Sequence, residues 1–186
     1  MILFIDTETT GLPDYRLPVD APSQPSVLQL SVLTETEVAM NSYVVPMQPV
    51  PADVVAIHGI TTEIATLAGR PRVEVALYLL GWLHLATEVV AFNAEFDWFL
   101  IQTMFARSGI SRESWPPRFC CMKASRDIAC IPPTDRQVAA GYGNEWKTPS
   151  LAEAYRIICG KEIRCAHDAL ADAEACRELY YALRGR

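Results

Sequence analysis

The chain has 186 residues, of which 51% are hydrophobic and 20% are charged, and its formal net charge is −6. This length suits one domain with a sizeable core, so we expect a single domain over residues 1–186. No apolar run approaches the roughly 18–20 residues that cross a bilayer, which excludes a membrane-spanning protein. The acidic balance argues against a protein that grips a long nucleic-acid duplex, because such proteins usually carry a basic footprint.

The first residues and the cysteines indicate a cytoplasmic protein. The chain starts Met1-Ile-Leu-Phe-Ile-Asp6 and has no basic region before its apolar run, so we do not expect a signal peptide. Its six cysteines include no C-x-x-C pair and match no zinc-binding spacing. We therefore expect reduced and mostly buried thiols.

The first part of the sequence predicts an antiparallel meander. A short apolar run ends at Asp6, and the turn-forming residues Thr9–Pro13 interrupt it. Two runs with β-branched residues follow, with a turn near Thr34–Thr36 between them. The expected strands here are Ile2–Ile5, Val27–Leu33 and Glu37–Val45, with loops over residues 13–26 and Pro46–Pro51.

Helices and strands alternate in the rest of the chain, where apolar residues at helical spacing in Arg72–Ala86, and cap or stop residues elsewhere, indicate the helices. The expected helices are Thr61–Ala68, Arg72–Ala86, Ala94–Arg107, a helix that ends at Cys130, Leu151–Ile158, and a last helix from Asp168 to about Leu183. The expected strands are Val89–Phe92 and Phe119–Met122, and residues 132–148 are expected to form a long surface loop. This order predicts an α/β fold, in which a mixed central sheet combines the three-stranded meander with parallel strands and is flanked by helices.

Two carboxylates stand at the end of the first expected strand. Asp6 and Glu8 are two positions apart and therefore point to the same face of a strand. Two neighbouring acids at this place repel each other unless a cation holds them together, and hard oxygen ligands suit Mg²⁺ or Mn²⁺. Two solvated acids before a turn explain the pattern equally well when it is taken alone.

Another acid follows the strand expected at Val89–Phe92. Asp97 lies in the first turn of the next helix, at a strand end of the kind where ligands gather in α/β sheets. A surface acid favoured by the helix dipole is the alternative, and Glu95 fits that alternative better than Asp97 does.

The last polar motif runs from His167 to Asp172. The pair makes chemical sense if His167 lies just before the helix and Asp172 faces inward from it, because an imidazole there can take a proton from water. We expect Asp168 to cap this helix. An ordinary helix N-terminus beside a solvated histidine is the alternative.

In this order, the motifs Asp6-Thr-Glu8-Thr-Thr-Gly11, Asn93-Ala-Glu-Phe-Asp97 and His167-Asp-Ala-Leu-Ala-Asp172 resemble those of the DEDDh exonucleases, the DnaQ-like branch of the ribonuclease-H-like superfamily. Ile57–Thr61 is also similar to a segment of that family, and the resemblance spans nearly the whole chain. It implies a ribonuclease-H-like fold and a 3′–5′ exonuclease, a hydrolase that releases nucleoside 5′-monophosphates from the ends of single-stranded DNA or RNA.

Carried over residue by residue, the resemblance implies two divalent ions, Mg²⁺ or Mn²⁺, held by Asp6, Glu8, Asp97 and Asp172. It implies that His167 is the general base. The positions that match contacts to the terminal nucleotide are Thr9, Thr10, Leu12, Ile57, His58 and Asn93. Lys147 resembles a phosphate-contacting lysine of some relatives, with a solvated loop lysine as the alternative. Phe92 departs from the family, because many relatives have histidine there.

Three interpretations of the function stay open at this point. The chain is an active exonuclease, free or as a proofreading partner of a polymerase in DNA replication or repair. It is an RNA-trimming or oligoribonucleotide-degrading enzyme on the same fold. Or it is a binding module without hydrolysis, which is disfavoured because all four acids and the histidine are present. The sequence stops soon after the last expected helix, which favours a stand-alone nuclease. It does not decide between DNA and RNA, and it leaves open a polymerase or a second copy of the chain as partner.

Overall fold

The computed structural model describes residues 1–111, 114–143 and 145–185. Its strands are β1 (Ile2–Thr9), β2 (Val27–Leu33), β3 (Val38–Tyr43), β4 (Glu88–Ala91) and β5 (Arg118–Cys120). They form one sheet in the order β3-β2-β1-β4-β5. The first three strands pair antiparallel, and β4 and β5 continue the sheet in parallel with β1. The mixed sheet predicted from the element order is therefore confirmed.

The first strand is longer than the sequence predicted, and this matters for the acids on it. β1 ends at Thr9 instead of Ile5, because its polar second half pairs with β2. In this ladder Asp6 lies opposite Ser31 and Glu8 lies opposite Gln29. Both carboxylates are thus fixed on a paired strand and not on a turn. The other strands lie within a few residues of their predicted positions.

The helices are α1 (Ala52–His58), α2 (Thr62–Ala68), α3 (Arg72–Leu85), α4 (Ala94–Ala106), α5 (Cys121–Ala129), α6 (Asp135–Ala139), α7 (Leu151–Cys159) and α8 (Ala169–Arg184). Most follow the sequence prediction closely. Two short helices were not predicted: α1 follows the proline-rich loop, and α6 lies within the expected surface loop, where Thr134 forms a capping box. Among the described residues, no helix is long and apolar enough to cross a membrane.

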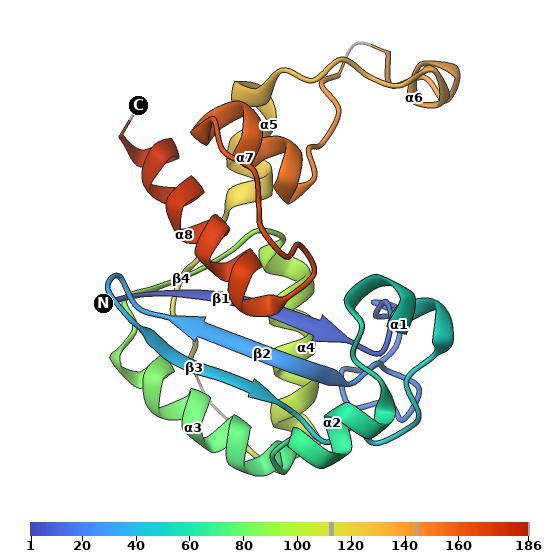
Figure 1. Cartoon of the computed structure of the whole chain (residues 1–186), viewed down its shortest axis with the longest axis vertical. Helices are drawn as coiled ribbons and strands as arrows, with labels where there is room; N and C mark the ends of the chain where they lie inside the picture. The colour runs from blue at the N-terminus through green and yellow to red at the C-terminus, as the bar shows by residue number, and fades with distance from the viewer. Residues whose placement is uncertain (112–113, 144, 186) are drawn as a thin grey trace.

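The helices cover the two faces of the sheet in separate layers (Figure 1). Leu3 and Ile5 of β1 pack in the core with α3 and α4, whereas Phe4, between them, packs with α7 and α8 on the other face. Side chains alternate along a strand, so Asp6 and Glu8 follow Phe4 onto the face that α8 covers. The fold therefore directs both acids of β1 toward the last helix.

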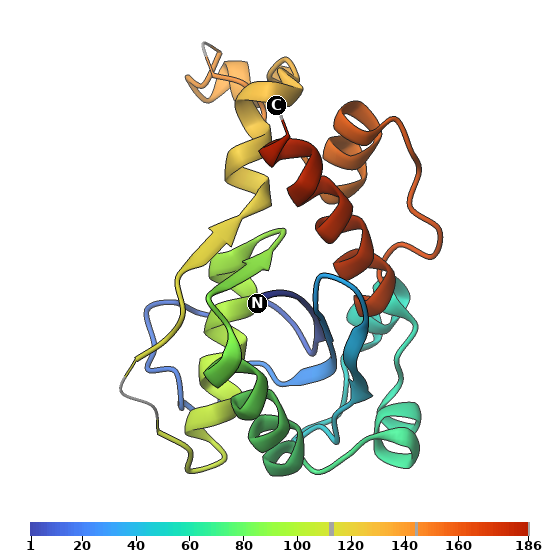
Figure 2. The same cartoon turned by 90° about the vertical axis from the view of Figure 1, so that its left-hand side faces the viewer.

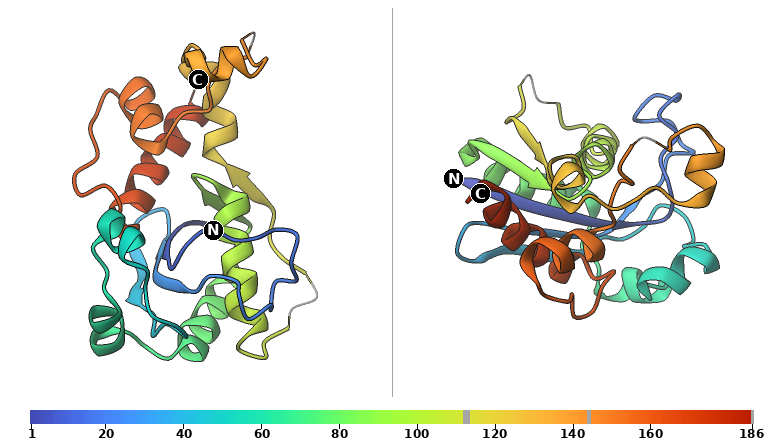
Figure 3. Two further views of the ribbon diagram at one scale, coloured as in Figure 1. Left: turned by 90° about the vertical axis from the view of Figure 1, so that its right-hand side faces the viewer. Right: turned by 90° about the horizontal axis from the view of Figure 1, so that it is seen from above.

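Several segments gather at the carboxyl end of β1. The N-terminal end of α8 lies over this end of the sheet, and α1 lies beside it (Figures 1 and 3). The Nε2 atom of His58, at the end of α1, is 3.2 Å from the carbonyl oxygen of Thr9. The segment that carries α6 instead extends from α5 away from the sheet (Figures 1 and 2).

Candidate active site

The structure brings the four predicted acids together at the carboxyl end of β1. Because β1 and β4 are parallel neighbours, their carboxyl ends meet at one edge, and α4 begins just after β4 with Asp97 in its first turn. Asp172 lies in the first turn of α8, which packs on the face toward which Asp6 and Glu8 point. Three elements from distant parts of the chain thus supply one cluster.

Burial and mutual repulsion make it costly for these carboxyls to ionise together. The pKa of Asp6 lies well above its usual value, first because of burial and then because of the charges of Asp97, Asp172, Glu8 and Asp168. Burial, followed by the charges of Asp172, Asp97 and Asp168, raises the pKa of Glu8 to about 7. The pKa of Asp97 is also raised to about 7, and that of Asp172 is raised, in both cases mainly by burial. Such a cluster favours protons or cations.

A threonine between the two acids of β1 fixes Asp97. The backbone N–H of Thr7 donates to Oδ1 of Asp97 at 3.1 Å, and the Thr7 hydroxyl donates to the same oxygen at 2.8 Å. These bonds favour the ionised carboxylate and oppose the effect of burial on its pKa. Sequence analysis missed Thr7, although its place between two acids puts its side chain on the α4 face of the strand.

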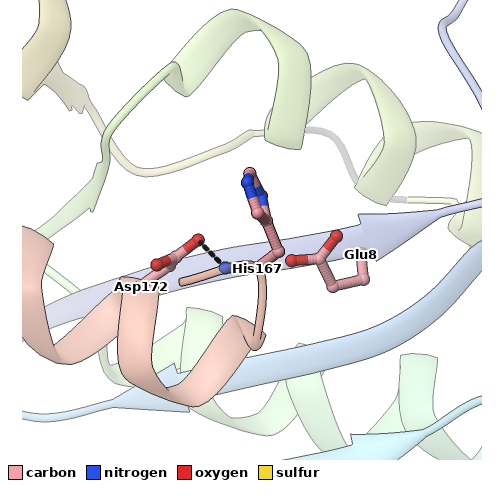
Figure 4. Close-up of side chains that lie close together, drawn as sticks. All are labelled: Glu8, His167 and Asp172. Carbon is pink, nitrogen blue, oxygen red and sulfur yellow. Dashed lines mark hydrogen bonds between the residues drawn. The ribbon is translucent and has the colours of Figure 1, made fainter. Parts of the chain in front are cut away.

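His167 lies between two of the acids (Figure 4). One ligand atom each from Glu8, His167 and Asp172 lies within 4.8 Å of the others. The backbone N–H of His167 donates to Oδ2 of Asp172 at 3.2 Å, and the histidine takes the left-handed backbone conformation with φ of 68°. This conformation is uncommon for a residue with a side chain. As predicted, His167 precedes α8 and Asp172 faces inward.

One oxygen of the cluster has no hydrogen-bond partner among residues 1–111, 114–143 and 145–185. Oδ1 of Asp172 is buried and makes no hydrogen bond within the described part of the chain. A buried, unpaired carboxylate oxygen is unfavourable in an isolated protein. Together with the raised pKa values, it shows that the residues present suit a hard divalent cation.

The start of α8 has the predicted cap. Oδ1 of Asp168 accepts hydrogen bonds from the backbone N–H groups of Leu170 and Ala171, both at 3.1 Å. Its other carboxylate oxygen, Oδ2, accepts from the side-chain amide of Gln29 on β2 at 3.1 Å. The cap therefore also ties the helix to the sheet, a contact that the local sequence did not reveal.

The predicted nucleotide contacts fall into two groups. Some side chains are engaged within the protein: the Thr9 hydroxyl donates to the Gly11 carbonyl at 2.8 Å, and the Thr10 hydroxyl accepts from the Ser26 N–H at 2.8 Å. The ring of His58 accepts from the Ile60 N–H at Nδ1, which leaves Nε2 to donate to the Thr9 carbonyl. These three side chains hold the turn after β1 and the end of α1 in place.

Other predicted contacts are apolar and exposed. The exposed fraction is 85% for Leu12, which follows that turn, and 59% for Ile57, which adjoins His58. Asn93 is half-buried, and its carbonyl accepts from the Asp97 N–H at 3.3 Å at the start of α4. Lys147 pairs with Glu153 at the start of α7, so its ammonium group is engaged by that carboxylate.

Two further residues near Asp97 complete this side of the site. Glu95 is exposed and pairs with Lys123, as expected for a surface acid. Tyr15, which the sequence did not predict as a site residue, is 60% exposed in the loop after β1. Its ring lies edge-on to the ring of Phe99, with 5.0 Å between the two ring centroids. Burial raises the pKa of the Tyr15 phenol, and the charges of Glu95 and Asp97 add to this. The only sequence signal was an aromatic residue soon after the first motif.

Comparisons with known proteins agree with the geometry. The RNase_T exonuclease family model matches residues 3–180. The uncharacterized exonuclease CP81 of Escherichia phage 186 is 31% identical over 114 residues, which cover 61% of this chain and 53% of the phage protein. DNA polymerase III subunit epsilon of Pasteurella multocida is 26% identical over 186 residues and covers 98% of this chain and 68% of the relative.

Solved structures of E. coli exonuclease I share the fold. The complex with a dA16 oligonucleotide matches with a TM-score of 0.73 and 20% identity, over 100% of this chain and 41% of that chain. The product-bound structure matches with a TM-score of 0.75, over 43% of that chain. The ribonuclease-H-like fold is thus confirmed, and the chain spans less than half of exonuclease I. Exonucleases of the matched family generally depend on divalent metal ions, and the acid cluster is a candidate site for them.

Proposed function

Because the chain belongs to the RNase_T exonuclease family, we propose that it is a 3′–5′ exonuclease that shortens single-stranded DNA or RNA and releases nucleoside 5′-monophosphates. The observation that carries this proposal is the convergence of four carboxylates and an imidazole in one cluster, where a buried oxygen of Asp172 has no hydrogen-bond partner in the described part of the chain. We take residues 1–186 as one catalytic domain.

The four acids, Asp6, Glu8, Asp97 and Asp172, would hold two divalent ions, Mg²⁺ or Mn²⁺. When bound, such ions would lower the pKa of a water molecule and offset negative charge at the leaving 3′-oxygen. Thr7 fixes one oxygen of Asp97 with two hydrogen bonds, so that this carboxylate keeps its orientation when the cluster fills. Four carboxylates offset the charge of a pair of ions better than three would.

His167 would accept the proton that the attacking water loses. Its side chain is exposed and lies between Glu8 and Asp172, so a water molecule can reach the ring. The hydrogen bond from the backbone N–H of His167 to Asp172 holds His167 at the cluster. This bond does not involve the ring nitrogens of His167. A general base in this position contributes to the rate by proton transfer.

Recognition would be of an end and not of a base sequence. Leu12, Ile57 and Tyr15 are exposed, and their side chains offer apolar or aromatic surface to a sugar or base, which is sequence-tolerant. Thr9, Thr10 and His58 would act by shaping the turn, and Asn93 by placing the start of α4. Lys147 pairs with Glu153, so it would contact a phosphate either by sharing its ammonium group with that carboxylate or by leaving it.

The fuller biological role is also a proposal. Exonuclease I is described in complex with dA16 and dT13 oligonucleotides, which supports single-stranded DNA as a substrate for this chain. The match to a polymerase III epsilon subunit over 98% of this chain supports a proofreading role beside a polymerase as the second candidate. An enzyme that trims RNA or degrades oligoribonucleotides remains the alternative on the same fold.

End-labelled oligonucleotides test the proposal. Single-stranded DNA, duplex DNA and RNA of one sequence are incubated with the protein in Mg²⁺ and in EDTA. We expect a ladder that shortens from the 3′ end and the release of nucleoside 5′-monophosphates in Mg²⁺, with no shortening in EDTA. Cleavage in EDTA, or internal cleavage without a ladder, would contradict the proposal. The preferred strand separates the DNA and RNA alternatives.

A further inference from the structure

A row of buried polar side chains lies on β2 behind the two acids of β1. Gln29 lies opposite Glu8 in the ladder and is 3% exposed, and Ser31 lies opposite Asp6 and is fully buried. Paired residues of an antiparallel ladder share a face, so both side chains lie on the face that α8 covers. Buried polar side chains need hydrogen-bond partners, and the partners of Gln29 and Ser31 indicate their structural role.

Gln29 joins the sheet to the first turn of α8. Its side-chain N–H donates to Oδ2 of Asp168 at 3.1 Å, and its carbonyl accepts from the backbone N–H of Ala169 at 3.3 Å. The same amide nitrogen donates to Oδ1 of Asn41 on β3 at 3.1 Å, and the Ser31 hydroxyl donates to that oxygen at 3.0 Å. One amide thus contacts a cap side chain, a helix backbone and the neighbouring strand.

These contacts lie immediately beside the reactive cluster. Asp168 follows His167, and its backbone carbonyl accepts from the Asp172 N–H at 3.0 Å. Because Asp172 is hydrogen-bonded to Asp168 within the first turn and His167 directly precedes Asp168 in the chain, a group that holds Asp168 and Ala169 also helps to set the positions of Asp172 and His167. Gln29 is paired in the ladder with Glu8, the acid that groups with His167 and Asp172.

We propose that Gln29 is a positioning residue that holds the first turn of α8 so that Asp172 and His167 meet Glu8. This inference rests on the proposed function for its catalytic consequence. An amide suits the place because it donates to a carboxylate and accepts from a backbone N–H at once. A carboxylate there can accept but not donate, and it adds an anion to acids whose pKa values are already raised.

The experiment compares variants that break and restore this pairing. Gln29→Met removes both hydrogen bonds to α8 with little change in size, and Gln29→Glu keeps the acceptor but loses the donor. In the double variant Gln29→Glu with Asp168→Asn, donor and acceptor exchange sides and the net charge equals that of the wild type. Tyr180→Phe is the matched control, because the Tyr180 hydroxyl donates to Glu88 at 2.7 Å and ties the other end of α8 to the sheet.

Each variant is measured in three ways: Mn²⁺ binding by calorimetry, thermal unfolding, and kcat and KM on a single-stranded oligonucleotide. We expect Gln29→Met to weaken Mn²⁺ binding and to lower kcat by roughly 10–100-fold, the range typical of residues that orient metal ligands, with KM changed less than kcat. Tyr180→Phe should lower the unfolding temperature yet keep Mn²⁺ binding and kcat. The double variant should recover Mn²⁺ binding and kcat relative to Gln29→Glu alone.

The outcomes separate positioning from plain stability and from the proposed function. If Gln29→Met and Tyr180→Phe lose kcat in proportion to their unfolding temperatures, or if Gln29→Met binds Mn²⁺ normally, the inference is wrong. If Gln29→Met does not fold, failure of the double variant to improve on Gln29→Glu overturns it. If the wild type cleaves no oligonucleotide but Gln29→Met still weakens Mn²⁺ binding, the positioning role stands and the proposed function falls.

Discussion

At the scale of single residues, the site combines acids that differ in how firmly the protein holds them. Asp97 receives two hydrogen bonds from Thr7 at one oxygen, whereas Asp172 keeps a buried oxygen that has no hydrogen-bond partner among the described residues. A carboxylate held by two hydrogen bonds is oriented before any ligand arrives, and a carboxylate oxygen without a hydrogen bond gains most from a ligand. The cluster therefore contains one carboxylate, Asp97, whose orientation is fixed, and one oxygen, of Asp172, that a cation would bind.

The acids give the first prediction. Asp6→Ala and Asp172→Ala should each lower the rate of 3′-end cleavage by more than the roughly 100-fold that loss of a merely supporting residue costs, because each removes a proposed ligand. Glu95→Ala is the control: this acid lies in the same helix turn as Asp97, but it is exposed and pairs with Lys123. Cleavage is followed on an end-labelled oligonucleotide in Mg²⁺. Normal rates in both test variants would remove these residues from the site.

His167 gives a second prediction with a different signature. His167→Ala should reduce kcat by roughly 10²–10⁴-fold, the contribution typical of a general base, because no imidazole would then accept the proton of the attacking water. Binding of Mn²⁺, measured by calorimetry, should change little, since the four acids remain. Asp172→Ala should lose both kcat and Mn²⁺ binding. The contrast between the two variants therefore distinguishes a general base from a metal ligand. A loss of Mn²⁺ binding as large as that of Asp172→Ala would make His167 a ligand instead.

At the scale of elements, the sequence predicted best where cap, proline or stop residues mark the ends of a segment. The predicted limits of β2, α2, α3, α4, α7 and α8 lie within one residue of the observed ones. The unpredicted helices α1 and α6 have no buried residue, so no apolar stripe marked them. The second half of β1 is polar because it carries the acids, which is why the apolar run alone ended the strand too early.

The same limit applies to contacts between elements. The three acidic motifs were visible locally, and their resemblance to a known family predicted that they converge. The contacts that orient them were not visible, because Thr7 and Asp97 are 90 positions apart and Gln29 and Asp168 are 139 apart. Such pairs depend on register and packing, which one sequence without its fold does not display.

The loop after β1 carries an element-scale prediction. Tyr15→Ala should raise KM for a single-stranded oligonucleotide roughly tenfold, because the loss of one base–aromatic stack is worth about 1–3 kcal/mol. Its kcat should change less, since no proposed ligand is touched. Tyr78→Ala is the control, because Tyr78 is 54% exposed on α3, in the layer opposite α8. An unchanged KM for Tyr15→Ala would exclude stacking on this ring.

At the scale of the whole molecule, the cluster lowers the stability of the metal-free protein. Glu8 and Asp97 have pKa values of about 7 in the folded chain, and burial and neighbouring charges also raise the pKa values of Asp6 and Asp172. Unfolded carboxyls titrate near pH ~4. Between these values the folded chain binds more protons than the unfolded chain, so its free energy of unfolding falls as pH rises.

This linkage predicts how unfolding depends on pH and on metal. In EDTA, the unfolding temperature should fall as the pH rises from about 5 to about 8, and Mg²⁺ should restore most of the loss at pH 8 because it binds only the folded cluster. Scanning calorimetry at both pH values, with and without Mg²⁺, measures the effect. Asp6→Asn should flatten the dependence in EDTA. A metal-free protein whose unfolding temperature rises over this interval would contradict the assignment.

The wide separation of the clustered residues along the chain also determines when the proposed activity could first arise during synthesis. Asp6 and Glu8 leave the ribosome early, but Asp172 and His167 come from α8 and the segment just before it. Until that stretch has emerged and docked on β2, a nascent chain holds only part of the cluster. The growing polypeptide would therefore stay inert toward the messenger and other nucleic acids around it until nearly all of these residues are made.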